Sequence, residues 1–177
     1  NLFTNNTIQN NSASSTYNIY LNSANSTTFN NNSIINSLAG FFAISSNVLT
    51  LNNNTFNSTA SPTVQINEST TILLDNNTIY NNFEAYLIPD SIINGNTILS
   101  TFILANSNNV TIFSNNVTYL LNITNSNDVN ISTNNLNYTR ILNTLNSNVD
   151  LNTLKIADVT NFSTGTIRSN DVDNVNG

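Results

Sequence analysis

The sequence contains no cysteine, histidine, methionine or tryptophan. Without cysteine the chain has no disulfide framework, no thiol nucleophile and no thiolate metal site. Without histidine, Ser-His-Asp and Cys-His catalytic groups and histidine-based zinc sites are excluded. Three basic residues stand against nine acidic ones, a net charge of −6, which opposes binding to nucleic-acid phosphates and to anionic lipid. We therefore expect no enzyme of these classes, no cofactor and no nucleic-acid partner.

Long apolar runs are also missing. No stretch approaches the roughly 20 residues that span a bilayer, so no membrane insertion is expected in this segment. Asparagine makes up about a quarter of the chain, and serine plus threonine about another quarter. Chains of this kind often stay disordered because they bury too little apolar area. Here Ile, Leu, Val and Phe are plentiful and regularly placed, which favours an ordered core.

One asparagine recurs about every twenty positions in the setting apolar–x–x–Asn–x–apolar. A period of this length is typical of stacked repeats, in which each unit contacts only its neighbours. The stretch Leu151–Leu154–Ile156 keeps the frame but carries Leu154 in the asparagine slot. The recurring asparagines are Asn6, Asn32, Asn54, Asn77, Asn96, Asn115, Asn134 and Asn170.

Apolar residues alternate between the asparagines, as in 110–123, which indicates strands. We assign Tyr119 to the inward face of that stretch. A twenty-residue unit has no room for helical connections. The predicted fold is all-β: a single-stranded parallel β-helix (solenoid) of about nine coils, each rising about 4.8 Å. Asparagine suits the corners because it tolerates the left-handed conformation.

The recurring amides are expected to stack at one corner as an internal asparagine ladder, each donating to one neighbour and accepting from the other. Leu154 should interrupt this ladder. The surplus residues of the longer early coils are assigned to loops within 9–28, 57–70 and 80–91. Residues 1–177 are expected to form one continuous solenoid, with 169–177 as a polar C-terminal tail. No capping helix is evident, so the expected partners are the chain itself, end to end in a filament, or adjoining coils of a longer protein.

Motifs such as Leu74-Asp75-Asn76-Asn77-Thr78-Ile79 and Ile93-Asn94-Gly95-Asn96-Thr97-Ile98 resemble the right-handed parallel β-helix repeat family, which includes pectate lyases and periplasmic copper-loading proteins. The Asn- and Thr-rich, Lys-poor texture is similar to the adhesin-like surface proteins of methanogenic archaea. That resemblance implies an extracellular, cell-surface role and names no ligand.

Few residues are candidates for chemistry or binding. The resemblance to polysaccharide lyases implies calcium-holding carboxylates and a basic Arg or Lys. The candidates here are Arg140, Lys155 and Arg168, with Asp150 and Asp158 nearby in sequence, and Arg140 and Lys155 could lie on one outward patch. The acidic residues are scattered, without the facing pair that glycoside hydrolysis needs. Asp171-x-Asp173 could ligate calcium. Tyr80, Phe83 and Tyr86 could form a sugar-stacking platform.

About 14 Asn-x-Ser/Thr sequons occur, close to the number that this composition produces by chance. Asn109, Asn122 and Asn130 lie in the outward phase and are the preferred glycosylation candidates. The function predicted from the sequence is a non-catalytic, extracellular structural or adhesive solenoid of a surface protein or filament. The alternative is a carbohydrate-active β-helix enzyme or glycan-binding module, and surface glycans are possible partners in both cases. A third hypothesis, ice binding, needs flat arrays of threonine that the sequence shows only in part.

Overall fold

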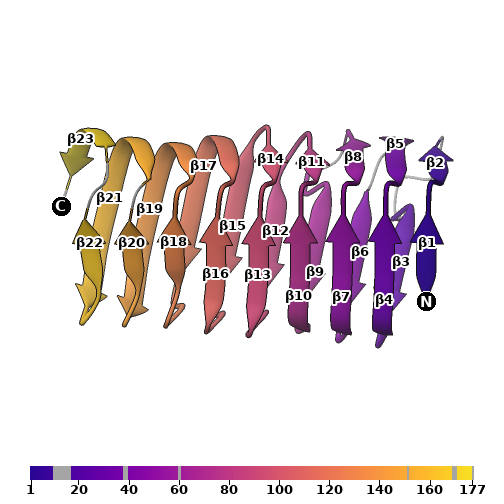
Figure 1. The fold of residues 1–177 in the computed structure, drawn as a ribbon, viewed down its shortest axis with the longest axis horizontal. Coiled ribbons are helices and arrows are strands. Elements are labelled where there is room, and N and C mark those ends of the chain that lie inside the picture. Colours follow the sequence, from indigo (N-terminus) through magenta and orange to yellow (C-terminus); the bar gives the residue numbers. More distant parts are fainter. Residues whose placement is uncertain (10–16, 38–39, 60, 151, 169–170, 177) are drawn as a thin grey trace.

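A computed structural model describes residues 1–9, 17–37, 40–59, 61–150, 152–168 and 171–176. These residues contain no helix, and so none that could cross a membrane. The chain winds as a parallel β-solenoid, with successive coils side by side along the long axis and the two termini at opposite ends (Figure 1). The predicted fold class is confirmed.

Sheet A supplies one strand to each coil, and all its strand pairs are parallel. Its nine strands face the viewer in Figure 1. In order along the rod they are β1 (Leu2–Thr4), β4 (Asn25–Asn30), β7 (Asn47–Asn52), β10 (Thr70–Asp75), β13 (Ser91–Asn94), β16 (Val110–Phe113), β18 (Asn130–Ser132), β20 (Asn148–Asp150) and β22 (Thr166–Arg168).

Sheet B forms the rest of the wall and begins as two stacks. The first stack holds β2 (Thr7–Gln9), β5 (Ser33–Ser37), β8 (Thr55–Ser58), β11 (Thr78–Ile79) and β14 (Thr97–Ile98). The second holds β3 (Ile19–Asn22), β6 (Phe41–Ile44), β9 (Val64–Asn67), β12 (Phe83–Tyr86) and β15 (Thr101–Ala105). Both stacks pair with β17 (Asn116–Thr124), and the wall continues through β19 (Asn135–Leu145), β21 (Thr153–Ser163) and β23 (Asp171–Asn176).

The segments assigned to loops therefore contain strands: β3 lies within 9–28, β9 within 57–70 and β12 within 80–91. The segment 169–177, expected to be a tail, includes β23, whose backbone pairs with β21. Residues 169–170 and 177 lie outside the described residues.

Left-handed backbone marks three corners of the solenoid. In the part of the chain that the structure describes, the positive-φ residues, 22 non-glycine residues and Gly95, fall in three columns along the rod. The first column is Asn5, Asn31, Asn53, Asn76, Gly95, Ser114 and Thr133; the second is Ser23, Ser45, Glu68, Leu87, Asn106, Asn125, Asn143 and Asn161; the third is Ser26, Val48, Thr71, Asp90, Asn109, Asp128, Asn146 and Thr164. At the first corner, the left-handed residue is the one before the recurring asparagine. The tolerance of asparagine for the left-handed conformation therefore does not explain why asparagine recurs there.

The recurring asparagine is explained by its hydrogen bonds. At Asn96, the backbone N–H and Nδ2 both donate to Oδ1 of Asn115, at 2.9 and 3.0 Å, while Nδ2 also donates to the carbonyl oxygens of Leu74 and Asn94. Asn77 donates to Oδ1 of Asn96 in the same way. A polar side chain inside the core is thus fully paired, which is what burial of an amide requires. The internal asparagine ladder is part of the fold.

The ladder continues through the coil where an interruption was expected. Asn134 donates from both nitrogens to Oδ1 of Asn152, each at 3.0 Å. Leu154 pairs with Leu136 two positions later, as a strand residue of the core. The expected frame was two residues out of register, because Leu151 and Ile156 fit the apolar setting as well as Val149 and Leu154 do. Asn170 lies outside the described residues.

A serine column completes the polar interior at the second corner. The backbone N–H of Ser107 donates to Oγ of Ser126 at 3.0 Å, and Oγ of Ser107 donates to the carbonyl oxygen of Ala105 at 2.9 Å. Ser46 and Ser69 repeat this arrangement in earlier coils. Between the two polar columns lies a continuous apolar core, in which Phe83 and Phe102 are fully buried and stack at 4.7 Å.

Candidate functional site

The second stack of sheet B carries apolar side chains on its outer face as well as in the core. Two outward columns run along it, defined by the strand register. The first is Tyr20, Phe42, Gln65, Glu84 and Ile103, and the second is Asn22, Ile44, Asn67, Tyr86 and Ala105. We call the outward apolar residues Tyr17, Tyr20, Phe42, Ile44, Tyr86 and Ile103 the aromatic face.

The rings at one end of this face are stacked on each other. Phe42 lies between Tyr17 and Tyr20, with ring centroids at 4.8 and 5.4 Å. The Tyr17 hydroxyl donates to Oε1 of Gln65 at 3.1 Å, which holds that ring across the face. Tyr20 nevertheless remains 57% exposed. Large rings that are fixed in place and still exposed are characteristic of interaction surfaces.

Glu84 is the one charged residue in the two columns. The Tyr86 hydroxyl donates to Oε2 of Glu84 at 3.2 Å. Partial burial raises the pKa of Tyr86 above its ordinary value of 10.0, and the Glu84 charge and this hydrogen bond add to the rise. Tyr86 is therefore a neutral donor near neutral pH, and it orients the carboxylate on the face.

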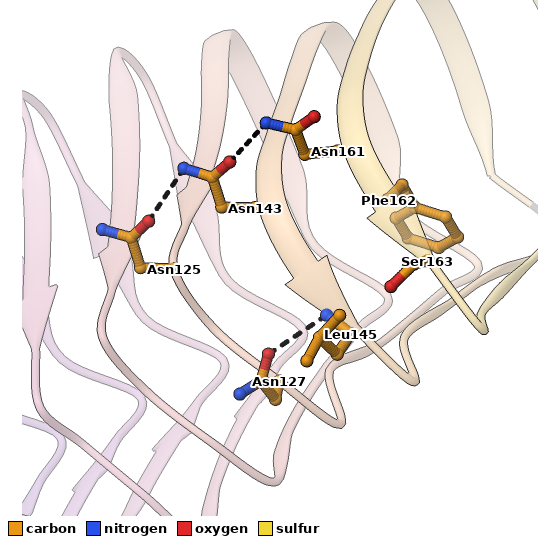
Figure 2. Close-up of a pocket in the computed structure, with 7 residues that line it drawn as sticks. All are labelled: Asn125, Asn127, Asn143, Leu145, Asn161, Phe162 and Ser163. Carbon is orange, nitrogen blue, oxygen red and sulfur yellow. Dashed lines mark hydrogen bonds between the residues drawn. The ribbon is translucent and has the colours of Figure 1, made fainter.

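A shallow groove of about 580 Å³ lies beside the second corner near the C-terminal end of the rod (Figure 2). An external amide ladder flanks it: Asn161 donates to Asn143 at 2.8 Å, and Asn143 donates to Asn125 at 3.0 Å. Oδ1 of Asn127 accepts from the backbone N–H of Leu145 at 3.1 Å. The residues that line it include no carboxylate and no base, so they cannot perform acid–base chemistry.

The proposed sugar platform is not assembled. Phe83 points into the core and is fully buried, while Tyr80 is 43% exposed and Tyr86 lies on the aromatic face. Tyr80 lies in the bend at 80–81, before β12 begins at Phe83. Tyr119, expected to point inward, is 64% exposed and lies where the register between β17 and β19 shifts, between Val117 and Leu120.

The candidate catalytic and metal residues do not form a site. Arg140 pairs with Asp158 at 3.6 Å and Arg168 with Asp150 at 3.7 Å, both as surface ion pairs. Among the described residues, no three His, Cys, Asp or Glu side chains lie close enough together to hold a metal ion. The side chains of Lys155 and Asp173 lie outside what the structure describes. Asp171 is exposed.

The glycosylation candidates differ in their surroundings. Asn109 and Asn130 are exposed, whereas Asn122 is half-buried in the outer column that continues the aromatic face, opposite Ile103 and Arg140. Asn109 donates to Oδ1 of Asp90 at 2.7 Å. Their glycosylation stays a prediction.

The aromatic face itself was missed by sequence reasoning. Its only sequence signal is the unusual presence of Tyr20, Phe42 and Tyr86 at positions that alternate with core residues. That signal becomes visible only when β3, β6 and β12 are recognised as strands.

No protein-family description matches the sequence, and neither does any curated protein. Among solved structures, a trypsin-treated form of QnrB1, a plasmid-mediated fluoroquinolone resistance protein, is similar with a TM-score of 0.32 and 10% identity, over 98% of this chain and 92% of that one. HetL, a pentapeptide repeat protein involved in heterocyst differentiation regulation from the cyanobacterium Nostoc sp. strain PCC 7120, is similar with a TM-score of 0.24 and 10% identity, over 97% and 88%.

These similarities do not show the archaeal adhesin-like group, and the parallel β-solenoid repeat rests on the strand order of the chain itself. The predicted extracellular adhesive or filament function is not borne out: the proteins found are described as a drug-resistance protein and a regulator of differentiation, and not as surface proteins. They do not support the carbohydrate-active or glycan-binding alternative either.

Proposed function

We propose that this chain is a non-enzymatic scaffold that binds another protein through the aromatic face. The observation that carries the proposal is the stack of Tyr17, Phe42 and Tyr20 on the outside of a wall whose inside is already a complete apolar core. The core does not need these rings. Exposed contiguous apolar groups favour association, and aromatic anchors dominate the binding energy of protein interfaces.

The rigidity of the solenoid supports this role. Strand β6 is hydrogen-bonded to β3 on one side and to β9 on the other, so Phe42 is held by backbone on both edges. A surface that is already ordered loses little conformational entropy on binding. The charge distribution also fits, since the two outward columns contain only Glu84 as a charged residue, and interface centres are depleted in charge.

A photo-crosslinking experiment tests the proposal. A photoreactive phenylalanine analogue at Phe42 should capture a partner in the source cell, whereas the same analogue at Thr111, outward on sheet A, should not. The captured protein is then purified and titrated against the full chain. We expect saturable binding that weakens at least about tenfold in Phe42→Ser or Tyr20→Ser, the effect of losing an aromatic anchor.

The matched controls are Leu73→Ser and Ile92→Ser, which remove exposed apolar side chains paired with each other on sheet A. These variants should bind with unchanged affinity, and circular dichroism should show all four variants folded. Equal loss in both pairs of variants, or none in either, would contradict an interface on the aromatic face.

A further inference from the structure

The chain separates its charges along the rod. All three basic residues, Arg140, Lys155 and Arg168, follow position 139. The two arginines pair with Asp158 and Asp150. The part that builds the aromatic face therefore has no Lys or Arg of its own, although it contains acidic residues. Those acidic residues before position 140 are Glu68, Asp75, Glu84, Asp90 and Asp128.

Glu84 is the acidic residue that lies within the columns of the aromatic face. In its column it lies between Gln65 and Ile103, and Tyr86 lies two residues further along the same strand. Oε2 of Glu84 accepts the Tyr86 hydroxyl. Among the described residues, no cation lies within ion-pair distance of this carboxylate, and no donor is bonded to Oε1. The carboxylate is thus held through Oε2 alone, and Oε1 has no hydrogen-bond partner among the described residues.

We propose, building on the protein-binding function above, that the aromatic face binds a segment carrying an arginine beside apolar residues. The guanidinium pairs with the Glu84 carboxylate and lies against the Tyr86 ring. Arginine fits better than lysine because its planar group can bond a carboxylate through two N–H groups and stack on a ring at the same time. A partly apolar setting strengthens such a charge-assisted bond relative to open water.

The strand order also gives the spacing of the partner's side chains. Phe42 lies on β6 and Glu84 on β12, with only β9 between them. Two strand steps are about 10 Å, which an extended peptide covers in about three residues. The partner segment should therefore carry an aromatic or aliphatic side chain about 10 Å from the arginine, seated on the Tyr17–Phe42–Tyr20 stack.

A peptide selection tests this inference and does not require an identified partner. A library of random peptides displayed on phage is selected against the full chain, and the recovered peptides are synthesised and titrated by calorimetry. We expect them to contain an arginine near an apolar residue. Their affinity should fall about fivefold to tenfold in Glu84→Gln, as for a partly exposed charge-assisted bond. Asp128→Asn, which changes the net charge equally at a distant corner, should have no effect.

A double-mutant cycle separates a direct pair from a general electrostatic effect. Replacing the peptide arginine with glutamine should weaken binding to the wild-type chain as Glu84→Gln does, and combining both changes should weaken it little further. Tyr86→Phe should retain most of the affinity because the ring remains, and Tyr86→Ser should not. Additive losses, or selected peptides without a basic residue, overturn the arginine assignment.

The failures of the two proposals are distinguishable. Peptides that lose binding in Phe42→Ser but bind Glu84→Gln normally refute the arginine pair and leave the protein-binding face in place. Peptides whose affinity is unchanged by Phe42→Ser refute both the protein-binding face and the arginine pair. A selection that recovers no binding peptides also refutes both.

Discussion

Asn134 and Asn152 form consecutive rungs of one ladder, with both nitrogens of Asn134 donating to Oδ1 of Asn152 at 3.0 Å. Asn152 in turn donates to the carbonyl oxygens of Ile131 and Asp150. The column of amides therefore passes through the coil in which the sequence frame had placed Leu154. This relationship sets the register of the last described coils.

Substitution within the ladder should be strongly destabilising. Asn96→Ala removes the acceptor of the Asn77 N–H groups and the donor to Leu74, which leaves buried polar groups without partners. We expect a loss of about 2–4 kcal/mol in the free energy of unfolding, measured by urea denaturation. The control is Asn135→Ala, whose side chain makes an exposed bond to Asn116 and should change stability by less than about 0.5 kcal/mol. Equal losses of stability in Asn96→Ala and Asn135→Ala would mean that the buried ladder stabilises the fold no more than an exposed amide pair does.

The register of the eighth coil can be tested directly. Asn152→Leu should destabilise the protein by about 2–3 kcal/mol, because it leaves the buried N–H groups of Asn134 without a hydrogen-bond acceptor. Leu154→Asn should also destabilise it, since Leu154 packs in the apolar core. If Leu154 were the ladder position, Leu154→Asn would be tolerated or stabilising. Thermal unfolding followed by circular dichroism distinguishes the two registers.

Two glycines should respond differently to a larger side chain. A Cβ at Gly40 would collide with the backbone carbonyl of Thr63, which accepts the Phe41 N–H. Gly40→Ala should therefore cost about 2 kcal/mol or more. Gly95 has φ +64, but its column holds asparagine at 31, 53 and 76, and the obstacle is the flexible Asn76 side chain. Gly95→Asn should cost less than about 1 kcal/mol in the same denaturation assay.

Substitution of the aromatic residues near β12 should cost more stability where the ring is in the core than where it is on the surface. Phe83→Ala should destabilise by about 3–5 kcal/mol, because it opens a cavity against Phe102. Tyr80→Ala should change stability by less than about 1 kcal/mol, because its ring is exposed. Comparable losses from the two substitutions would show that Tyr80 also packs in the core.

Alkaline pH should weaken the fold through Tyr86. Its pKa is raised in the folded chain by burial first and by Glu84 second, so the unfolded chain loses this proton at lower pH than the folded one. Stability should be unaffected below pH 10.0, the ordinary pKa, and should decrease as the pH rises above it. Glu84→Gln should lower the pKa of Tyr86. The titration is measured by the absorbance of ionised tyrosine, and the Tyr86→Phe variant identifies which part of the signal belongs to Tyr86. An unchanged titration in Glu84→Gln would exclude the carboxylate as a cause.

The sequence determined the solenoid and most of its ladder. Inward positions such as Ile93, Asn96 and Ile98 recur with nearly constant spacing, and stacking like on like is the arrangement that buries them all. The absence of histidine and cysteine likewise excludes whole classes of chemistry on composition alone.

Tertiary structure alone decided where each corner falls. Inward residues are spaced by two within a strand but by three across each left-handed residue, as from Leu104 to Ser107 to Val110. Left-handed residues here include Val48, Thr71 and Leu87, which have no local preference for that conformation. At Leu87, the backbone N–H donates to the carbonyl oxygen of Ala105 and the carbonyl accepts from the N–H of Ser69, so hydrogen bonds to the coils on either side hold this conformation. The face on which Tyr86 and Phe42 lie therefore depends on contacts between coils, which the periodicity of a single coil does not contain.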